Sequence, residues 1–266
     1  MFACPTNQPA LPALFDPSLP NKPALWAVLE GRHSGRSLVD DLVHPTQCLL
    51  RTDACLTYPS IQISQTFLDQ AIGHFRATES VWLVWPPSLP DRLAAPEAGQ
   101  TVQRLEFSDY DPQDRVLEDL RKRLPVGFEI LPLDQRLLER CEWKSEMEFY
   151  CGSLENFLRH DFGLCMLHEG EIITEAYASS IGRGVAEIGA ITHEPFRGQG
   201  YAAIACAFLI QACERRGCQV SWTCNADNQA SIQVARKLGF RQPRAYLIYD
   251  YDSFTSNNSA PAPHRS

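Results

Sequence analysis

A glycine-rich turn in the C-terminal half of the chain has the residue types of an anion-binding site. The turn, Arg197-Gly198-Gln199-Gly200-Tyr201-Ala202, lies between a strand-like run at 185–192 and a helix-like run at 201–216. Glycine lets the backbone approach a ligand where a Cβ would clash, and a helix start offers free N–H groups and the positive end of its dipole. Arg197 adds a guanidinium that can bind phosphate through two hydrogen bonds. The turn therefore predicts a phosphate-binding site.

The pattern of this turn does not match two widespread nucleotide-binding motifs. It is not Gly-x-x-x-x-Gly-Lys-Ser/Thr, so a nucleotide P-loop is not indicated. It is also not Gly-x-Gly-x-x-Gly with an acidic residue about 20 positions further on, so a dinucleotide-binding fold is not indicated. The segments that follow the turn are needed to identify its ligand.

Three features after the turn lead to a family resemblance. Residues 220–224 alternate as a short strand, Asn228 opens the next helix-like run, and Lys237-Leu238-Gly239-Phe240 ends it. Together with the turn, they resemble the GNAT superfamily of N-acetyltransferases over residues 128–250. In that superfamily the pattern Arg/Gln-x-x-Gly-x-Gly/Ala binds the pyrophosphate of acetyl-CoA. A narrower resemblance, to a bacterial two-domain GNAT subfamily of mostly unassigned substrate, is carried by segments such as 27–31, 39–41 and 222–224.

The resemblance implies acetyl-CoA as co-substrate and a set of residues that bind it, and we expect no metal. The end of the strand would pair with the pantetheine amides as an extra strand would, and the turn would hold the pyrophosphate. Asn228 would bond the pantetheine or cap its helix, and the two roles are compatible. Ser231 would add a hydroxyl contact or lie on the helix surface. The residues so assigned are Ala190, Ile191, Thr192, Arg197, Gly198, Gln199, Gly200, Tyr201, Ala202, Asn228 and Ser231.

Acetyl transfer to an amine requires a group that removes a proton from the amine. Glu187, ten residues before Arg197, is the leading candidate for this general base. Several protein-acetylating GNAT members carry their catalytic glutamate in a similar Ala-Glu-Ile sequence, with a spacing that differs by about one residue. The alternative is that Glu187 is a structural residue of the strand. His193 and Glu194 are further candidates, but we expect them to be exposed at the strand's end.

One position departs from a common GNAT pattern. Many members carry a tyrosine seven residues after the motif asparagine, where it protonates the leaving thiolate, and this chain has Ala235 there. Either the thiolate leaves without an acid, or another group such as Tyr246 or Tyr249 serves. A backbone N–H near Ile191 could stabilise the oxyanion of the tetrahedral intermediate.

These residues predict an N-acetyltransferase that moves an acetyl group from acetyl-CoA to an amine by direct attack. We expect a small-molecule acceptor, because the chain has no extended basic or aromatic segment suited to reading a peptide. One alternative is transfer of a longer acyl group. The other is a non-catalytic acyl-CoA-binding sensor or scaffold, which the alanine at 235 favours. Four acidic residues could attract a cationic amine or form a solvated helix face: Glu146, Glu148, Glu155 and Asp161.

The elements that must position this site predict an α/β chain of two domains. The order of strands and helices after residue 128 is that of the GNAT fold, a mixed and mostly antiparallel sheet flanked by helices. A smaller α/β domain of unknown role precedes it, and no second Arg-x-x-Gly-x-Gly/Ala turn occurs there. The expected division is an irregular Pro-rich N-terminus at 1–21, a first domain at 22–125, the GNAT domain at 128–252 and a disordered tail at 253–266.

The composition bears on what the protein binds and where in the cell it acts. The formal net charge of −8 argues against nucleic-acid binding, which favours a basic surface. No apolar run reaches the ~18 residues needed to cross a bilayer, and the N-terminus lacks the pattern of a signal peptide. The ten cysteines include no Cys-x-x-Cys pair, so free thiols in a reducing cytosol explain them better than disulfides or a zinc site. We therefore expect a cytoplasmic protein.

Overall fold

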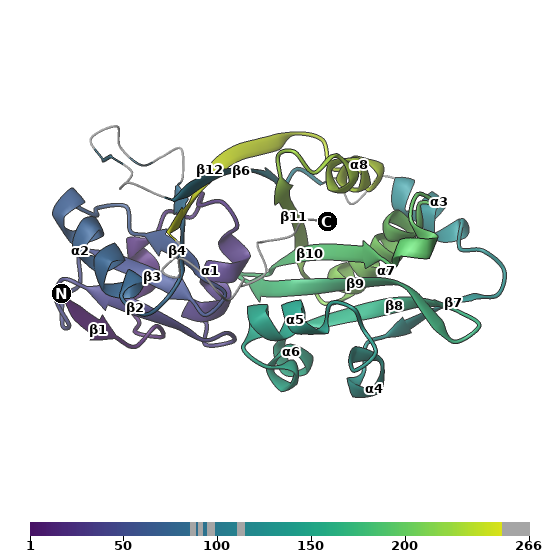
Figure 1. Cartoon of the computed structure of the whole chain (residues 1–266), viewed down its shortest axis with the longest axis horizontal. Coiled ribbons are helices and arrows are strands. Elements are labelled where there is room, and N and C mark those ends of the chain that lie inside the picture. The colour runs from purple at the N-terminus through teal and green to yellow at the C-terminus, as the bar shows by residue number, and fades with distance from the viewer. Residues whose placement is uncertain (86–88, 90–92, 95–98, 111–114, 252–266) are drawn as a thin grey trace. The chain divides into compact units, whose positions relative to one another are not determined.

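The chain divides into two compact units. The computed structural model describes residues 1–85, 89, 93–94, 99–110 and 115–251 (Figure 1). One unit contains residues 1–104 and the segment that begins at Ala245, and the other contains residues 105–244. The predicted disordered tail lies outside the described residues. Among these, no helix combines the length and the apolar character that a membrane span requires.

The boundary between the units differs from the predicted one near Pro125. Helix α3 (Val116–Lys122) precedes this proline, and its Leu117 and Leu120 are buried in the same core as helix α7 (Tyr201–Arg215). The segment before Pro125 therefore belongs to the second unit. At the other end, strand β12 (Pro243–Tyr251) pairs antiparallel with a strand of the first unit. Both differences arise from contacts between residues far apart in the sequence, which local periodicity does not report.

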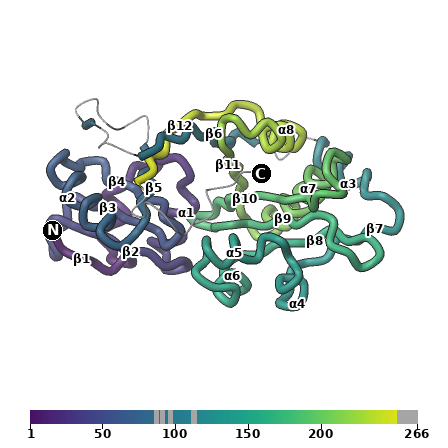
Figure 2. Tube along the Cα trace, in the orientation of Figure 1, coloured from purple at the N-terminus to yellow at the C-terminus, as the bar shows by residue number. Residues whose placement is uncertain are grey.

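The first unit is a mixed sheet with helices. Helix α2 connects two parallel neighbouring strands, β4 and β5 (Figure 2). The strand order is β1 (Phe2–Cys4), β2 (Gly35–Val39), β3 (Cys48–Thr52), β4 (Leu56–Pro59), β5 (Val81–Trp85) and β12. The helices are a 3₁₀ turn (Leu11–Leu14), α1 (Lys22–Leu29) and α2 (Gln65–Arg76).

The N-terminal segment predicted to be irregular contains ordered elements. Strand β1 pairs antiparallel with β2, from Phe2 opposite Val39 to Cys4 opposite Ser37. The apolar side chains of Leu11, Phe15 and Leu19 are buried, although prolines interrupt any regular spacing between them. Local sequence patterns did not predict these elements, because the segment is held in place by pairing with a strand that is distant in the sequence and by burial.

The second unit contains a mixed sheet whose neighbouring strands β7 to β10 are antiparallel, with β11 parallel to β10 (Figure 1). This is the predicted fold class. Beyond α3 and α7, its elements are β7 (Phe128–Pro132), α4 (Gln135–Leu138), α5 (Lys144–Cys151), α6 (Leu154–His160), β8 (Phe162–His168), β9 (Glu171–Gly182), β10 (Val185–Thr192), a 3₁₀ turn (Glu194–Phe196), β11 (Gln219–Asn225) and α8 (Gln229–Lys237). Strand β6 (Gln100–Phe107) crosses the boundary between the units.

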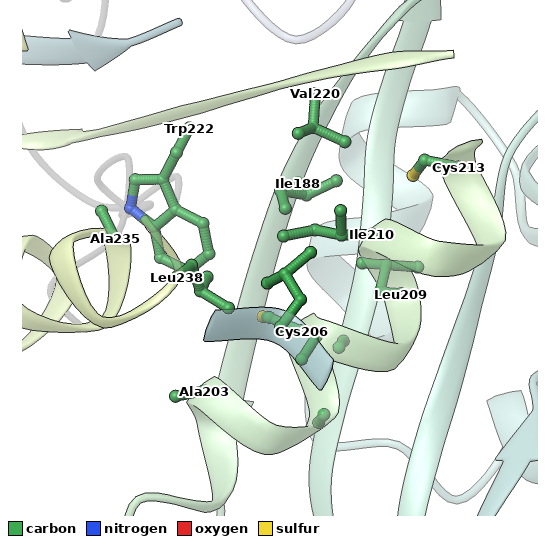
Figure 3. Packing of buried hydrophobic residues seen from close by; sticks show 14 of the residues in the cluster. Ile188, Ala203, Cys206, Leu209, Ile210, Cys213, Val220, Trp222, Ala235 and Leu238 are labelled. Carbon is green, nitrogen blue, oxygen red and sulfur yellow. The ribbon is translucent and has the colours of Figure 1, made fainter. Parts of the chain in front are cut away.

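The two faces of this sheet pack against different helices. Side chains alternate across a strand, so Leu164 and Met166 of β8 join the core around α7, while Cys165 and Leu167 join the core of α4 to α6. Figure 3 shows Ile210 of α7 packed among residues of the core around α7, which include Ile188 of β10 and Val220 of β11. β10 therefore has one side facing α7 and the other facing α4 to α6.

The two units repeat one arrangement of strands. β2, β3 and β4 are antiparallel neighbours, and α2 leads from β4 to the parallel strand β5. In the second unit β8, β9 and β10 are antiparallel neighbours, and α7 leads from β10 to the parallel strand β11. The turn before α2, residues 60–64, contains no glycine, so the first unit repeats the topology without the phosphate turn.

All ten cysteines are free thiols, and every one except Cys218 is buried. Burial raises the pKa of the Cys206 thiol and raises that of Cys213 to about 12. The sulfur atoms of Cys141 and Cys165 lie 3.8 Å apart, and both residues pack in the core of α4 to α6. The thiols therefore act as small apolar side chains in this fold.

Candidate cofactor and acceptor site

The predicted phosphate turn, residues 197–202, lies between β10 and α7, and its last two residues are the first two of that helix. Gly198 and Gly200 have φ angles of +80° and +85°, in the left-handed region, and Gly200 is the residue immediately before the helix. A Cβ on either glycine would meet no atom within 4 Å. The backbone conformation, and not crowding within the protein, therefore requires glycine at both positions. The N–H groups of the first turn of α7 have no partner within the helix and face this turn.

Side chains of the turn are held in defined positions. Arg197 donates from Nε to the carbonyl of Thr192, at 3.0 Å, so its guanidinium is fixed beside the end of β10. Its two Nη groups form no hydrogen bond with any described residue. Tyr201 donates from Oη to Oε1 of Gln199, at 2.9 Å, and its ring packs against Phe128. Arg197 is thus oriented with donors left for an anion.

A cavity of about 580 Å³ opens beside the turn. Gly198, Gln199, Gly200 and Tyr201 line one side of it. The end of α3 and the last residue of α8 contribute two cationic side chains, Arg123 and Lys237, to its wall. The cavity therefore combines free helix N–H groups with positive charge.

Strands β10 and β11 separate next to this turn. Their parallel pairing runs from Val185 opposite Gln219 to Glu187 opposite Ser221 and stops there, although β10 continues to Thr192 and β11 to Asn225. On its other edge β10 stays paired with β9 as far as Thr192. The backbone of residues 188–192 therefore faces β11 without strand pairing in the described chain. The predicted residues Ala190, Ile191 and Thr192 lie on this edge, and all three are half-buried.

Glu187 lies where the two strands part. Its side chain is only 7% exposed, and its carboxylate accepts hydrogen bonds from Ser221 Oγ, Thr223 N and Thr223 Oγ1, each at 2.8 Å. The Thr223 N–H would reach a β10 carbonyl in a continued ladder, and here it binds a side chain instead. A β-bulge between Glu187 and Ile188 accompanies the change. The carboxylate therefore fixes the separation of β10 and β11.

The residues assigned from α8 make contacts within the protein. Asn228 caps the helix, because its Oδ1 accepts a hydrogen bond from the Ser231 N–H at 3.0 Å. The Ser231 hydroxyl accepts a hydrogen bond from Trp222 Nε1 at 3.0 Å. Ala235 is fully buried in the α7 core, with Trp222 beside it (Figure 3). A tyrosine at 235 would have to displace this packing, which gives a physical reason for alanine there.

A buried carboxylate that the sequence did not single out organises the opposite end of β10. Glu175 has no exposed surface and accepts from the backbone N–H groups of Glu142 and Trp143, at 2.6 and 3.1 Å. Its Oε1 lies 2.8 Å from His193 Nε2. His193, which we expected to be exposed, has a side chain only 16% exposed. The signal in the sequence was a single charged residue within an otherwise uncharged stretch, 172–178.

Two packed aromatic side chains lie over Gly189 on the α4 to α6 side of β10. Trp143 and Tyr177 pack edge to face, with 5.0 Å between ring centroids. A Cβ on Gly189 would lie 3.8 Å from the Trp143 ring and 3.8 Å from Tyr177 Oη. Glycine therefore leaves a space at 189 that both rings border.

The Tyr177 hydroxyl is the unusual group of this aromatic pair. The residue is 1% exposed, and Oη forms no hydrogen bond with any described residue. Buried tyrosine hydroxyls ordinarily have a partner. Burial, together with the nearby acidic groups Glu146 and Glu175, raises the pKa of Tyr177, so the hydroxyl stays protonated. It can both donate and accept a hydrogen bond there.

The other acidic residues considered for amine attraction have separate environments. Glu155 is exposed and pairs with Arg159 at 2.6 Å, and Glu148 is exposed on α5. Asp161 is buried and accepts from the Cys151 thiol at 3.4 Å. Glu146 is half-buried and is the member of the set that lies near Tyr177.

Comparison with known proteins identifies the family. The family model described as GNAT acetyltransferase matches residues 13–249, which is most of the chain. A curated relative, the uncharacterized N-acetyltransferase YdfB of Bacillus subtilis (strain 168), is 23% identical over 232 residues, covering 85% of this chain and 88% of the relative.

Solved structures agree with this match. A GCN5-related N-acetyltransferase-like protein from Streptococcus suis is 26% identical, with a TM-score of 0.70 over 91% of this chain and 96% of the other. A GCN5-related N-acetyltransferase from Sphaerobacter thermophilus shares the fold at 13% identity, with a TM-score of 0.58 over 98% of both chains. The chain belongs to the GNAT acetyltransferase family.

Proposed function

We propose that this protein is an N-acetyltransferase that moves an acetyl group from acetyl-CoA to the amine of a small molecule. Family membership implies the use of acetyl-CoA. The observation that carries the proposal is the separation of β10 and β11 directly before a glycine turn at a helix start. This arrangement supplies an unpaired backbone edge for amides and an N–H cluster for phosphates in one continuous path.

The residues of this path fit the parts of the co-substrate. N–H groups of the turn and the guanidinium of Arg197 bind the pyrophosphate. The backbone of Ala190, Ile191 and Thr192 pairs with the pantetheine amides as a neighbouring strand would. The acetyl thioester, which supplies the activated acyl group, then reaches the level of Gly189. Asn228 and Ser231 act from α8 by fixing the start of that helix and the Trp222 ring.

The acceptor amine enters from the side of Trp143 and Tyr177. Glu146 and Glu175 make this region negative, which favours an amine that arrives as a cation. Glu187 is the proposed general base, since it is a buried carboxylate two residues before Gly189 on the same strand. It removes a proton so that the nitrogen lone pair can attack the thioester carbon. The C–S bond then breaks, the acetyl group stays on the nitrogen, and CoA leaves as a thiolate that takes up the proton the nitrogen loses. The Tyr177 hydroxyl hydrogen-bonds the acceptor or the oxygen on which charge develops.

A non-catalytic acyl-CoA-binding protein is the second candidate, because Ala235 stands where many GNAT members have a tyrosine. A thiol-release assay over a panel of amines separates the two candidates. Release that depends on the amine supports the enzyme, and acyl-CoA binding without release for any amine supports the sensor or scaffold. Repeating the assay with longer acyl-CoA thioesters tests the alternative acyl preference.

The turn should lose cofactor affinity when Gly200 is replaced. Gly200→Ala forces an L-residue into a left-handed conformation at the start of α7, so the N–H groups should shift away from the phosphates. We expect the Kd for CoA to rise at least tenfold, ~1.4 kcal/mol, in calorimetry. Gly217→Ala is the matched control, because Gly217 has a φ of +72° and open space around it just after the C-terminal end of α7. Equal Kd values for the two variants would remove this turn from the cofactor site.

Glu187→Gln should lower turnover about 10²–10⁴-fold, the usual contribution of a general base. The amide also faces three donors with one fewer acceptor oxygen, so the free energy of unfolding should fall by about 1–3 kcal/mol. Ser221→Ala is the control that separates these effects, because it removes one donor and keeps the carboxylate. Near-normal turnover in Glu187→Gln, with an unshifted pH–rate profile, would leave Glu187 only the role of holding the strands apart.

Tyr177→Phe should lower kcat/KM for the amine at least tenfold while the Kd for CoA stays unchanged. The free energy of unfolding should change by less than about 0.5 kcal/mol, because the hydroxyl that is lost binds no described residue. Tyr58→Phe provides the opposite case, since the buried Tyr58 hydroxyl donates to the carbonyl of Asn21 at 3.0 Å. That variant should lose stability and keep kcat/KM. Unchanged kinetics in Tyr177→Phe would mean that its hydroxyl does not contact the substrate.

A further inference from the structure

The cavity beside the phosphate turn has two cations that the turn itself does not provide. Arg123 directly follows the last residue of α3, and Lys237 is the last residue of α8. Both line the same cavity as Gly198, Gln199 and Gly200. Helices α3 and α8 therefore each contribute one positive side chain, from their C-terminal ends, to this cavity.

The side chains of these two cations form no hydrogen bond or ion pair with any described residue. Basic residues close to Arg123 behave differently. Lys122 pairs with Glu118 at 2.6 Å, and Arg121 donates from Nη1 to the carbonyl of Ala207 at 3.3 Å. In a chain with a formal net charge of −8, two cations that line one cavity without an ion-pair partner among the described residues are complementary to an anion.

The proposed co-substrate carries more phosphate than the turn accounts for. CoA has a pyrophosphate and, on the ribose of its adenosine, a separate 3′-phosphate. The N–H groups of the turn and Arg197 suit the pyrophosphate, as argued above, and they leave the third phosphate without a partner. A phosphate monoester carries up to two negative charges at neutral pH and is bound well by paired cationic side chains.

We propose that Arg123 and Lys237 form a subsite for the ribose 3′-phosphate of CoA, so that the protein distinguishes CoA from 3′-dephospho-CoA. The inference rests on the proposed use of acetyl-CoA and deepens it. It also gives α3, which precedes the expected GNAT domain, a part in cofactor recognition. Asp119 also lines this cavity, and its negative charge would repel the phosphate. Its carboxylate lies 3.9 Å from Lys122 Nζ.

The test is calorimetry of the full chain with CoA and with 3′-dephospho-CoA. Wild type should bind CoA at least tenfold more tightly. Arg123→Ala and Lys237→Ala should each reduce that preference about three- to tenfold, because they weaken CoA and leave the affinity for 3′-dephospho-CoA unchanged. Asp119→Asn should increase the preference. Arg159→Ala, which removes a cation paired with Glu155 on α6 and outside this cavity, should leave it unchanged.

Each other outcome overturns the proposal. Equal weakening of both ligands in Arg123→Ala and Lys237→Ala would mean that these cations act on the pyrophosphate. No change with either ligand would mean that they only stabilise the ends of their helices. Wild type that binds both ligands equally would exclude a 3′-phosphate subsite. Wild type that binds neither ligand would contradict the proposed co-substrate itself, and the subsite would fall with it.

Discussion

The candidate site depends on one buried carboxylate, which accepts hydrogen bonds from β11 at the point where backbone pairing between β10 and β11 stops. Glu187 binds Ser221 and the N–H and hydroxyl of Thr223, and beyond this point β10 and β11 no longer pair. A parallel pair held only by backbone bonds would close over the edge at 188–192. Because the carboxylate satisfies the β11 donors itself, that edge stays available for the amides of a ligand. The same strand leads through the 3₁₀ turn (Glu194–Phe196) into the glycine turn, so the course of the chain places the separated strand edge next to the predicted phosphate site.

A second buried carboxylate fixes the surroundings of that strand. Glu175 binds the backbone of Trp143, which packs against Tyr177 over Gly189, and it also holds His193, which precedes the glycine turn. A fully buried acidic group is tolerated because each of its oxygens has a donor. The two glutamates therefore fix the contacts of β10 near its start, through Glu187, and near its end, through Glu175. Between them lie Gly189, which leaves space, and Tyr177, whose hydroxyl has no described partner.

Local patterns predicted the parts of the site that depend on local structure. The turn at 197–202, the strand 185–192 and the Asn228 cap follow from residue types at fixed spacing, and each has the expected place in the fold. The places of Arg123 beside the turn and of Glu175 behind β10 could not be predicted, because they come from helices and strands that meet only after folding. Strand β1 was missed for the same reason. The repeated strand order of the first unit was also hidden, because that unit has no glycine turn to mark it.

The most direct measurement is a crystal structure of the full chain with acetyl-CoA. We predict that the pyrophosphate lies against the N–H groups of residues 198–202 and that the pantetheine amides pair with the β10 backbone at 188–192. The carbonyl carbon of the acetyl group should then lie within reach of Gly189 and the Tyr177 hydroxyl. Continued pairing of β10 with β11 past Glu187, with the cofactor bound elsewhere on the chain, would contradict the account.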